Sequence, residues 1–232
     1  MPGLGLSSVA FTGALRRYPT YALLLKSYEG ANTTTLWQDL SGHFIAGIPQ
    51  YSTGFALTPN AQNGRAGYLA TAASPADTHF ILPALSTTVG DYTVTLALRV
   101  DEATNCYPMI AGDGPNTSSD YTYFGLNSSD NHCYSLRGVG AAIGRVVAVG
   151  AGQTAVVQYR LNSAGASVLV NGVVLASGLA WTPALWGVGT LGNQLLGQLL
   201  HGVLFGLAVS LGNDSDEQVA YTRAMFMAEL GL

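Results

Sequence analysis

An Asn-Gly pair at residues 171–172 separates two apolar runs in the stretch VLVNGVVLA (168–176). Asn-Gly suits a type I′ turn, because both central residues of that turn take a positive φ. β-branched residues flank the pair on each side, and this combination predicts a tight β-hairpin. Neither arm carries a charged residue, which raises the question of what such an apolar ribbon packs against.

Alternation of apolar and polar residues predicts further strands. Every second residue from Tyr92 to Val100 is apolar, and Thr93 and Thr95 are expected on the opposite face. Short strands at intervals of roughly 8–12 residues, with turn residues between them, are typical of an antiparallel sandwich or barrel. We therefore expect a continuous antiparallel sandwich over residues 91–210. The other candidate strands are 20–28, 79–85, 121–126, 133–138 and 154–161.

The segment from Leu195 to Leu211 is apolar enough to be mistaken for a membrane span. Gln198 and His201 interrupt it, and no Lys or Arg flanks it. Its last part alternates, which predicts a buried strand rather than a membrane helix. The residues expected on one side of that strand are Val203, Phe205, Leu207 and Val209.

The last residues of the chain predict a helix. Ser215 is a suitable N-cap, and Gln218 three residues later completes a capping box. Asp216 and Glu217 in the first turn complement the helix dipole. An apolar stripe is expected to lie against the sandwich. That stripe consists of Val219, Phe226 and Leu230.

Composition limits the classes of partner. Only 9% of the 232 residues are charged, against roughly 25% in ordinary soluble domains. A net charge of −4 and a pI near 5.4 give no basic surface for nucleic acid or an anionic membrane. No linker, repeat or charge block divides the chain, so we expect a single domain over residues 21–232, preceded by an arm or first strand at 1–20. Arg16 and Arg17 follow the apolar residues of the N-terminus, the reverse of a secretory leader, so no signal peptide is expected.

Cys106 and Cys133 do not form a disulfide framework in a chain of this size. Two small buried thiols are the preferred interpretation, and the disulfide state stays open. His132 next to Cys133 is not sufficient for a metal site, because no other thiol or imidazole is near in sequence. We expect no metal cofactor here.

Three segments in order resemble the laminin-G-like branch of the concanavalin A-like lectin/glucanase superfamily. They are LWQDLSG (36–42), QYRLNSAGASVLVNGVVLASG (158–178) and GVLFGLAVSLGNDSDEQVAYTRAMF (202–226). The first contains Trp-x-Asp-x-Ser-Gly, the second the Val-Asn-Gly hairpin, and the third a strand followed by an acidic-capped helix. The matching motif residues are Trp37, Asp39, Ser41, Gly42, Asn171 and Gly172.

This resemblance implies an all-β fold, an antiparallel jelly-roll β-sandwich with a short C-terminal helix. Chains with the early Trp-x-Asp-x-Ser-Gly segment are similar to domains of bacteriophage tails, fibres and other virion surface proteins. The hairpin at 168–176 would then be an interior ribbon of one sheet, apolar because both of its faces are covered. Trp37 would lie in the core and Asp39 would fix a turn.

The sequence argues against an enzyme. The superfamily includes retaining glycoside hydrolases, which need two carboxylates about 5–5.5 Å apart. None of the four glutamates has an acidic partner at alternate strand positions, and the adjacent Asp101 and Glu102 would face opposite sides of a strand. There is no Gly-x-Ser-x-Gly elbow, P-loop, His-Glu-x-x-His or EF-hand pattern.

The best candidate contact surface is the loop AGDGPNTSSDYTYFG (111–125). Its carboxylates and amides can bond sugar hydroxyls, its aromatic rings can stack on a sugar ring, and such oxygen ligands also suit Ca²⁺. The alternative is a solvated turn followed by a strand. Trp181 and Trp186 could likewise stack on a ligand, although burial is the commoner use of an indole. The candidate ligand-binding residues are Asp113, Asn116, Asp120, Tyr121, Tyr123 and Trp181.

Two functions remain open. The first is a non-enzymatic structural subunit of a bacteriophage virion, assembled in the bacterial cytoplasm and contributing to host attachment. The second is a lectin-like module that binds host glycan. Because 9% charged residues cannot cover the surface in the usual way, we expect contacts with other copies of the chain, a trimer being slightly preferred, and with other virion proteins.

Overall fold

The computed structural model describes most of the chain after residue 20. Of these residues, the strands between 106 and 146 and residues 190, 193–194 and 198–199 are described by backbone alone. The expected arm at 1–20 lies outside the described residues, and the division into 1–20 and 21–232 stays a prediction. The described residues are 21–51, 54–71, 74, 78–85, 90–101, 106–112, 121–127, 133–138, 141–146, 152–179, 186, 189–194 and 198–232.

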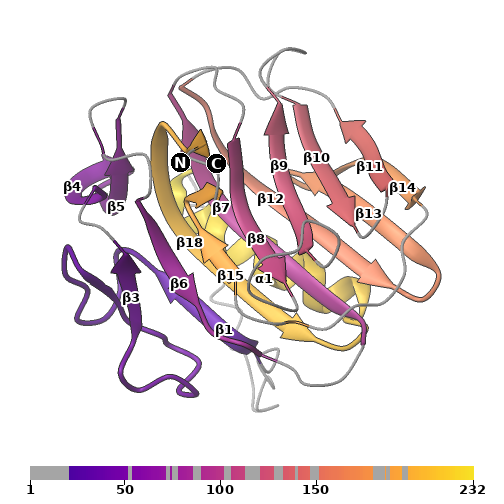
Figure 1. The fold of residues 1–232 in the computed structure, drawn as a ribbon, viewed down its shortest axis with the longest axis horizontal. Helices are drawn as coiled ribbons and strands as arrows, with labels where there is room; N and C mark the ends of the chain where they lie inside the picture. The colour runs from indigo at the N-terminus through magenta and orange to yellow at the C-terminus, as the bar shows by residue number, and fades with distance from the viewer. Residues whose placement is uncertain are drawn as a thin grey trace, which may run out of the picture.

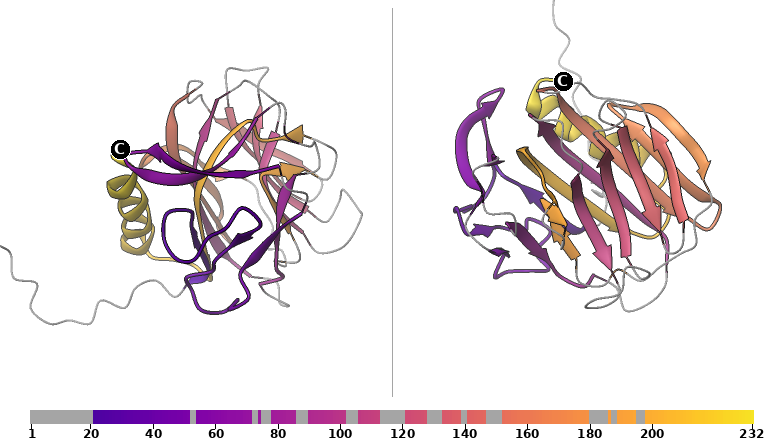
Figure 2. Two further views of the ribbon diagram at one scale, coloured as in Figure 1. Left: turned by 90° about the vertical axis from the view of Figure 1, so that its left-hand side faces the viewer. Right: turned by 45° about the horizontal axis from the view of Figure 1, so that its top comes forward.

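Two antiparallel sheets lie face to face, and one helix, α1 (Asp216–Leu230), packs on the outside of the first sheet (Figures 1 and 2). The all-β sandwich with a C-terminal helix that the sequence predicts is therefore confirmed. The first sheet has the order β14-β13-β12-β7-β18-β5-β4, and β1 also pairs with β18. Its strands are β1 (Tyr21–Lys26), β4 (Ala56–Gln62), β5 (Arg65–Ala70), β7 (Tyr92–Val100), β12 (Thr154–Asn162), β13 (Gly165–Val170), β14 (Val173–Leu179) and β18 (Gly202–Leu211).

The second sheet has the order β11-β10-β9-β8-β15-β6-β3-β2. After β15, the chain forms a separate two-stranded ladder of β16 (Asn193–Gln194) and β17 (Gln198–Leu199). The strands of the second sheet are β2 (Leu36–Trp37), β3 (Ile48–Tyr51), β6 (His79–Leu82), β8 (Cys106–Gly112), β9 (Tyr121–Asn127), β10 (Cys133–Gly138), β11 (Ala141–Val146) and β15 (Gly189–Leu191).

The main core fills the space between the two sheets. Alternate residues of β7, from Tyr92 to Val100, belong to it, as the period of two predicts. Trp37 is fully buried there, with its ring centroid 4.7 Å from that of Tyr68 and 5.2 Å from that of Phe80.

A second apolar cluster lies between the first sheet and α1. Phe226 and Leu230 of the helix meet Ala97 of β7 and Val156 of β12 there. The predicted polar face of β7 is consequently buried as well. Gln158 of β12 points to the same side, and its side-chain amide nitrogen donates to Thr95 Oγ1 at 3.1 Å and to the carbonyl of Val219 at 2.9 Å.

The expectation that four apolar residues of β18 share one side is wrong. Val203 and Phe205 face the helix, whereas Leu207 and Val209 lie between the sheets. The reason is a register shift against β7 between Leu204 and Gly206, since a bulge places one extra residue on one strand and reverses the faces beyond it. The expectation of a buried strand is confirmed. In the described part of the chain, no helix is long and apolar enough to span a membrane.

The Asn-Gly hairpin forms as the sequence predicts. Asn171 has a φ of +48° and Gly172 a φ of +87°, and Val170 pairs with Val173 across the turn. Asn171 also contacts β12, because its Oδ1 accepts a hydrogen bond from the amide of Val156 at 2.8 Å.

The surroundings of the hairpin differ from the expectation of a ribbon covered on both faces. β14 is an edge strand, and Val173 and Val174 are 61% and 57% exposed. β13 has the apolar burial that was predicted, with Val168 and Val170 in the core. The sequence could not distinguish the two arms, because both are uncharged and β-branched.

The C-terminal helix agrees with its predicted ends and buried stripe. Ser215 accepts a hydrogen bond from the amide of Gln218, and the Gln218 side chain accepts one from the Ser215 amide, which completes the capping box. The helix ends at Gly231, whose φ of +71° is the left-handed conformation typical of a C-cap. Its buried residues are Val219, Thr222, Phe226 and Leu230.

Candidate ligand-binding face

The predicted contact loop is only partly visible. Asp113, Asn116, Asp120 and Trp181 lie outside the described residues, so their part in a binding site stays a prediction. Tyr121 and Tyr123 are in β9, which pairs with β8 and β10. Cys106 and Cys133 begin the strands on either side of β9, and their disulfide state stays open.

The outer face of the second sheet, which looks away from the core, carries exposed apolar and aromatic side chains. On β6, Phe80 and Leu82 are fully buried, so Ile81 between them is on the outer face, where it is 37% exposed. Tyr51 of β3 is opposite His79 of β6 in the ladder and is 53% exposed. The Tyr51 and His79 rings stack at 5.0 Å with an interplanar angle of 22°.

Backbone pairing connects this corner of the sheet to β9. Ile81 pairs with Thr190, Thr190 with Ile110, and Ile110 with Tyr123. Residues that pair directly across antiparallel strands occupy the same face of the sheet. The register position of Tyr123 is therefore on the outer face, in one cross-strand row with Ile81. We call Tyr51, His79, Ile81 and the row to Tyr123 the tyrosine face.

Sequence reasoning identified Tyr123 but missed Tyr51 and His79. Tyr123 was noticed because it follows a loop rich in turn residues and carboxylates. Tyr51 is 28 residues from His79 in the chain (79 − 51), and only the pairing of β3 with β6 brings the two rings together. The exposed, alternating Pro49 and Tyr51 on β3 were the available local signal.

The Trp-x-Asp-x-Ser-Gly segment forms a fixed loop rather than a binding site. Asp39 is 5% exposed, and its Oδ1 accepts hydrogen bonds from the amides of Leu24 and Ser41 at 3.0 and 2.9 Å. Its Oδ2 accepts from the amides of His43 and Phe44 at 3.1 and 3.0 Å. With its lone pairs directed at the backbone, this carboxylate holds the loop that joins β2 to β3.

Ser41 and His43 complete the loop without forming a catalytic triad. The Ser41 hydroxyl donates to Asp39 Oδ2 at 2.6 Å and is 3.0 Å from His43 Nδ1. In a serine hydrolase the histidine lies between serine and aspartate, whereas here the serine lies between the other two. Gly42 has a φ of +85°, which explains the glycine of the motif.

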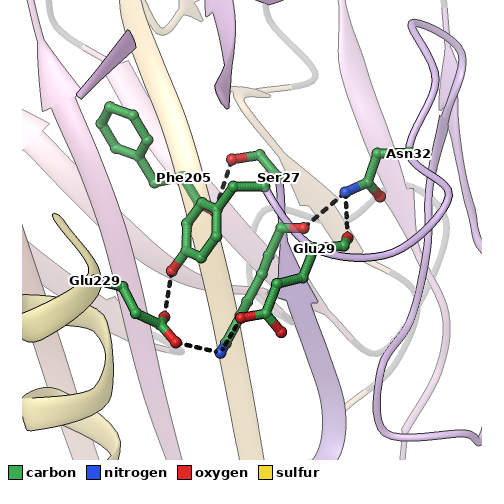
Figure 3. Close-up of polar contacts among 7 residues, drawn as sticks. Ser27, Glu29, Asn32, Phe205 and Glu229 are labelled. Carbon is green, nitrogen blue, oxygen red and sulfur yellow. Dashed lines mark hydrogen bonds and ion pairs between the residues drawn. The ribbon is translucent and has the colours of Figure 1, made fainter. Parts of the chain in front are cut away.

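A buried ion-pair cluster fastens the end of α1 to the sandwich (Figure 3). Lys26, the only lysine of the chain, is 5% exposed, and its ammonium lies 2.9 Å from Glu29 Oε1 and 2.8 Å from Glu229 Oε1. Tyr28 donates its hydroxyl hydrogen to Glu229 Oε2 at 2.7 Å. Burial and the adjacent carboxylate of Glu229 raise the pKa of Tyr28 far above its usual value. We interpret this cluster as structural, because every charged group in it has a partner within the chain.

Asparagine and arginine residues support the same cluster. Asn32 donates its side-chain amide to the carbonyls of Lys26 and Glu29 at 2.8 and 2.6 Å, which fixes the turn after β1. The guanidinium of Arg65 lies 5.4 Å from the ring centroid of Tyr28, within the range of a cation–π contact.

Most described carboxylates have a structural partner, and no group of three or more His, Cys, Asp or Glu residues is placed to hold a metal ion within the described part of the chain. Arg99 pairs with Asp101 and Arg160 with Asp216. The carboxylates with a partner are Glu29, Asp39, Asp101, Asp214, Asp216 and Glu229.

No protein-family model matches the sequence, and no curated protein matches it. Solved structures do match the fold. Domain 4 of AbnA, a GH43 extracellular arabinanase from Geobacillus stearothermophilus in complex with arabinotriose, is similar with a TM-score of 0.65 and 16% identity, over 88% of this chain and 98% of that domain. A structure described as a receptor binding domain matches with a TM-score of 0.58 and 12% identity, over 89% of this chain and 51% of that one.

Trypanosoma rangeli sialidase matches with a TM-score of 0.65 and 12% identity, over 89% of this chain. The present chain spans only about a third of that sialidase, 32% of its length. At such low identities these similarities establish the fold alone, an antiparallel β-sandwich. The lectin/glucanase, laminin-G-like and bacteriophage parts of the resemblance stay predictions.

Proposed function

We propose that the chain is a non-enzymatic carbohydrate-binding module and that the tyrosine face binds the saccharide. The observation that carries the proposal is the exposed ring of Tyr51, held in a stack with His79 beside the exposed Ile81. A ring presented on a strand is more rigid than one on a loop. A flat aromatic surface of this kind complements the apolar C–H face of a sugar ring.

The tyrosine face is also long enough for several sugar units. The cross-strand row from Ile81 to Tyr123 spans β6, β15, β8 and β9, and neighbouring strands lie about 4.7–4.9 Å apart. Such a row suits an extended oligosaccharide better than a single sugar. The Geobacillus arabinanase domain, whose fold this chain shares, was solved with arabinotriose, so short arabinan chains are the first ligands to test.

The absence of catalysis is part of the proposal. A retaining or inverting glycosidase needs two carboxyl groups beside the scissile bond. The described carboxylates that have partners are engaged in loop, ion-pair and helix contacts. Neither Tyr51 nor Ile81 has one of these acids beside it in its ladder.

The expected place in a bacteriophage particle remains a second, independent proposal. It rests on the early Trp-x-Asp-x-Ser-Gly segment and on the low charge of the chain. A saccharide-binding face is compatible with it, because a module on a virion surface can attach the particle to host glycan. Mass spectrometry of purified particles is the direct test, and absence of the chain from them would contradict it.

Substitution of Tyr51 tests the carbohydrate proposal. Tyr51→Ala should weaken saccharide binding by about 10- to 100-fold, since the loss of one aromatic contact is worth roughly 1.5–3 kcal/mol. Tyr51→Phe keeps the ring and should bind within about threefold of the wild type. Binding is measured by calorimetry with arabinotriose and by a glycan array.

One control variant and one further variant of the tyrosine face complete the binding experiment. Leu211→Ala changes an exposed apolar residue of the first sheet and should leave binding unchanged. Tyr123→Ala should weaken binding if the ligand extends along the row to β9. Blank arrays for the wild type, or equal affinities for the wild type and Tyr51→Ala, would contradict the proposal, as would turnover of the bound saccharide.

A further inference from the structure

The edge strand β14 is built differently from the other edge of the same sheet. In the described ladders β14 pairs with β13 alone, at the end of the sandwich opposite β4 (Figure 1). Its first two residues, Val173 and Val174, are 61% and 57% exposed. An exposed edge strand presents unpaired backbone groups that can pair with a further strand.

The opposite edge, β4, carries the usual protections. Pro59 lacks an amide hydrogen, and Asn60 has a φ of +54°, which interrupts regular pairing. Gln62 and Asn63 donate their side-chain amides to the carbonyls of Leu230 and Glu229, which ties that end of the strand to α1. β14 contains neither a proline nor a charged residue.

The regular part of the β14 edge is at its turn end. The ladder with β13 shifts register between Ala166 and Val168 and again between Val168 and Leu169. Before these shifts, Val173 pairs with Val170, and Val174 with Leu169. A new strand is therefore expected to pair there rather than at Leu179.

Charge indicates which strand would pair with it. From Leu161 to Asn213 the chain contains no Asp, Glu, Lys or Arg, so the ribbons of two copies do not repel each other through their own side chains, despite a net charge of −4. The Arg223 side chain of α1 lies against Gly172 at the turn. Antiparallel pairing about a two-fold axis also makes an edge strand complementary to itself. An unrelated partner would need a matching uncharged edge of its own.

From these observations we infer that the chain forms a two-fold symmetric dimer in which the β14 edges of two copies pair near Val173 and Val174, joining the two first sheets into one continuous sheet. The dimer does not depend on the proposed saccharide binding, because β14 belongs to the first sheet and the tyrosine face to the second.

The experiment is sedimentation velocity over a concentration series of the full chain. The wild type should be a dimer, and Val174→Lys, which places a charge on each copy at the contact, should raise the dissociation constant at least about tenfold. Leu211→Lys is the matched control, since Leu211 is 41% exposed and is the last residue of β18, where it pairs with Tyr92 of β7 and not with β14. It should dimerise like the wild type.

Hydrogen exchange on the wild type gives a second measurement that needs no variant. The amides of residues 173–175 should exchange more slowly at concentrations where the dimer forms than at concentrations where it dissociates. A monomer up to about 100 µM, a trimer with unchanged exchange in β14, or a Val174→Lys dimer as tight as the wild type would overturn the inference.

Discussion

At the residue scale, Asp39 shows how one buried carboxylate can accept several backbone hydrogen bonds of a loop. The amide of Leu24 in β1, the amides of Ser41, His43 and Phe44 in the loop, and the Ser41 hydroxyl all donate to it. Asp39→Ala should lower the free energy of unfolding by about 2–4 kcal/mol, because several buried donors lose their acceptor. Asp39→Asn keeps one acceptor oxygen and should cost less. Urea denaturation measures both, and equal stabilities for Asp39→Ala and the wild type would contradict this account.

Residue roles were predictable where the contact is local or where a motif carries it. Trp37 and Asp39 occupy the core and the turn that the resemblance implies, since the loop they fix spans only a few residues. The Tyr51–His79 stack was not predictable, because neither residue has a neighbour in sequence that points to the other. The positions of Asp113, Asn116, Asp120 and Trp181 stay predictions.

At the element scale, α1 is held at its C-terminal end by the cluster around Lys26. Glu229→Gln should lower the free energy of unfolding by about 1–3 kcal/mol, because it leaves a buried ammonium with one carboxylate. Glu29→Gln is the matched control, since the Glu29 side chain is 43% exposed and that of Glu229 only 22%. Solvent screens the more exposed pair, so its loss should be the smaller one. Thermal unfolding of the two variants gives the order. A larger loss for Glu29→Gln would contradict this account, and no loss for Glu229→Gln would mean that α1 docks through its apolar stripe alone.

Elements with strong local signals were predicted well, and their surroundings were not. The capping box at Ser215 and the turn at Asn171–Gly172 depend on a few adjacent residues. Next to the bulge that reverses the faces of β18, Gly206 lies so close to α1 that a Cβ there would be 2.2 Å from the Phe226 ring. Such an approach is visible only after the helix is placed. The same holds for β14, whose valines are as apolar as those of a buried strand.

At the scale of the whole molecule, the low charge of the chain is compatible with three apolar layers in contact. The second sheet, the first sheet and α1 enclose two apolar clusters, so both faces of the central strands β7, β12 and β18 are buried. The period-two pattern predicted the sandwich, while the covering of its second face by α1 required the tertiary structure. Among the described residues, the tyrosine face and the β14 edge carry exposed apolar side chains, and the ligand and the second copy are proposed to bind there.

The buried tyrosines couple the stability of the whole fold to alkaline pH. Burial raises the pKa of Tyr28, Tyr68 and Tyr21 above their usual value of about 10. The folded state then holds these protons at a pH where the unfolded state releases them, so the stability that the neutral hydroxyls contribute is fully present below about pH 10 and is lost as the pH rises above it. Urea denaturation at pH 9, 10 and 11 should show a falling free energy of unfolding. Tyr28→Phe and Tyr68→Phe should each reduce the slope of that fall, because each removes one of the protons. If the slope is the same in the wild type and in both variants, the alkaline loss comes from other groups and the tyrosines do not cause it.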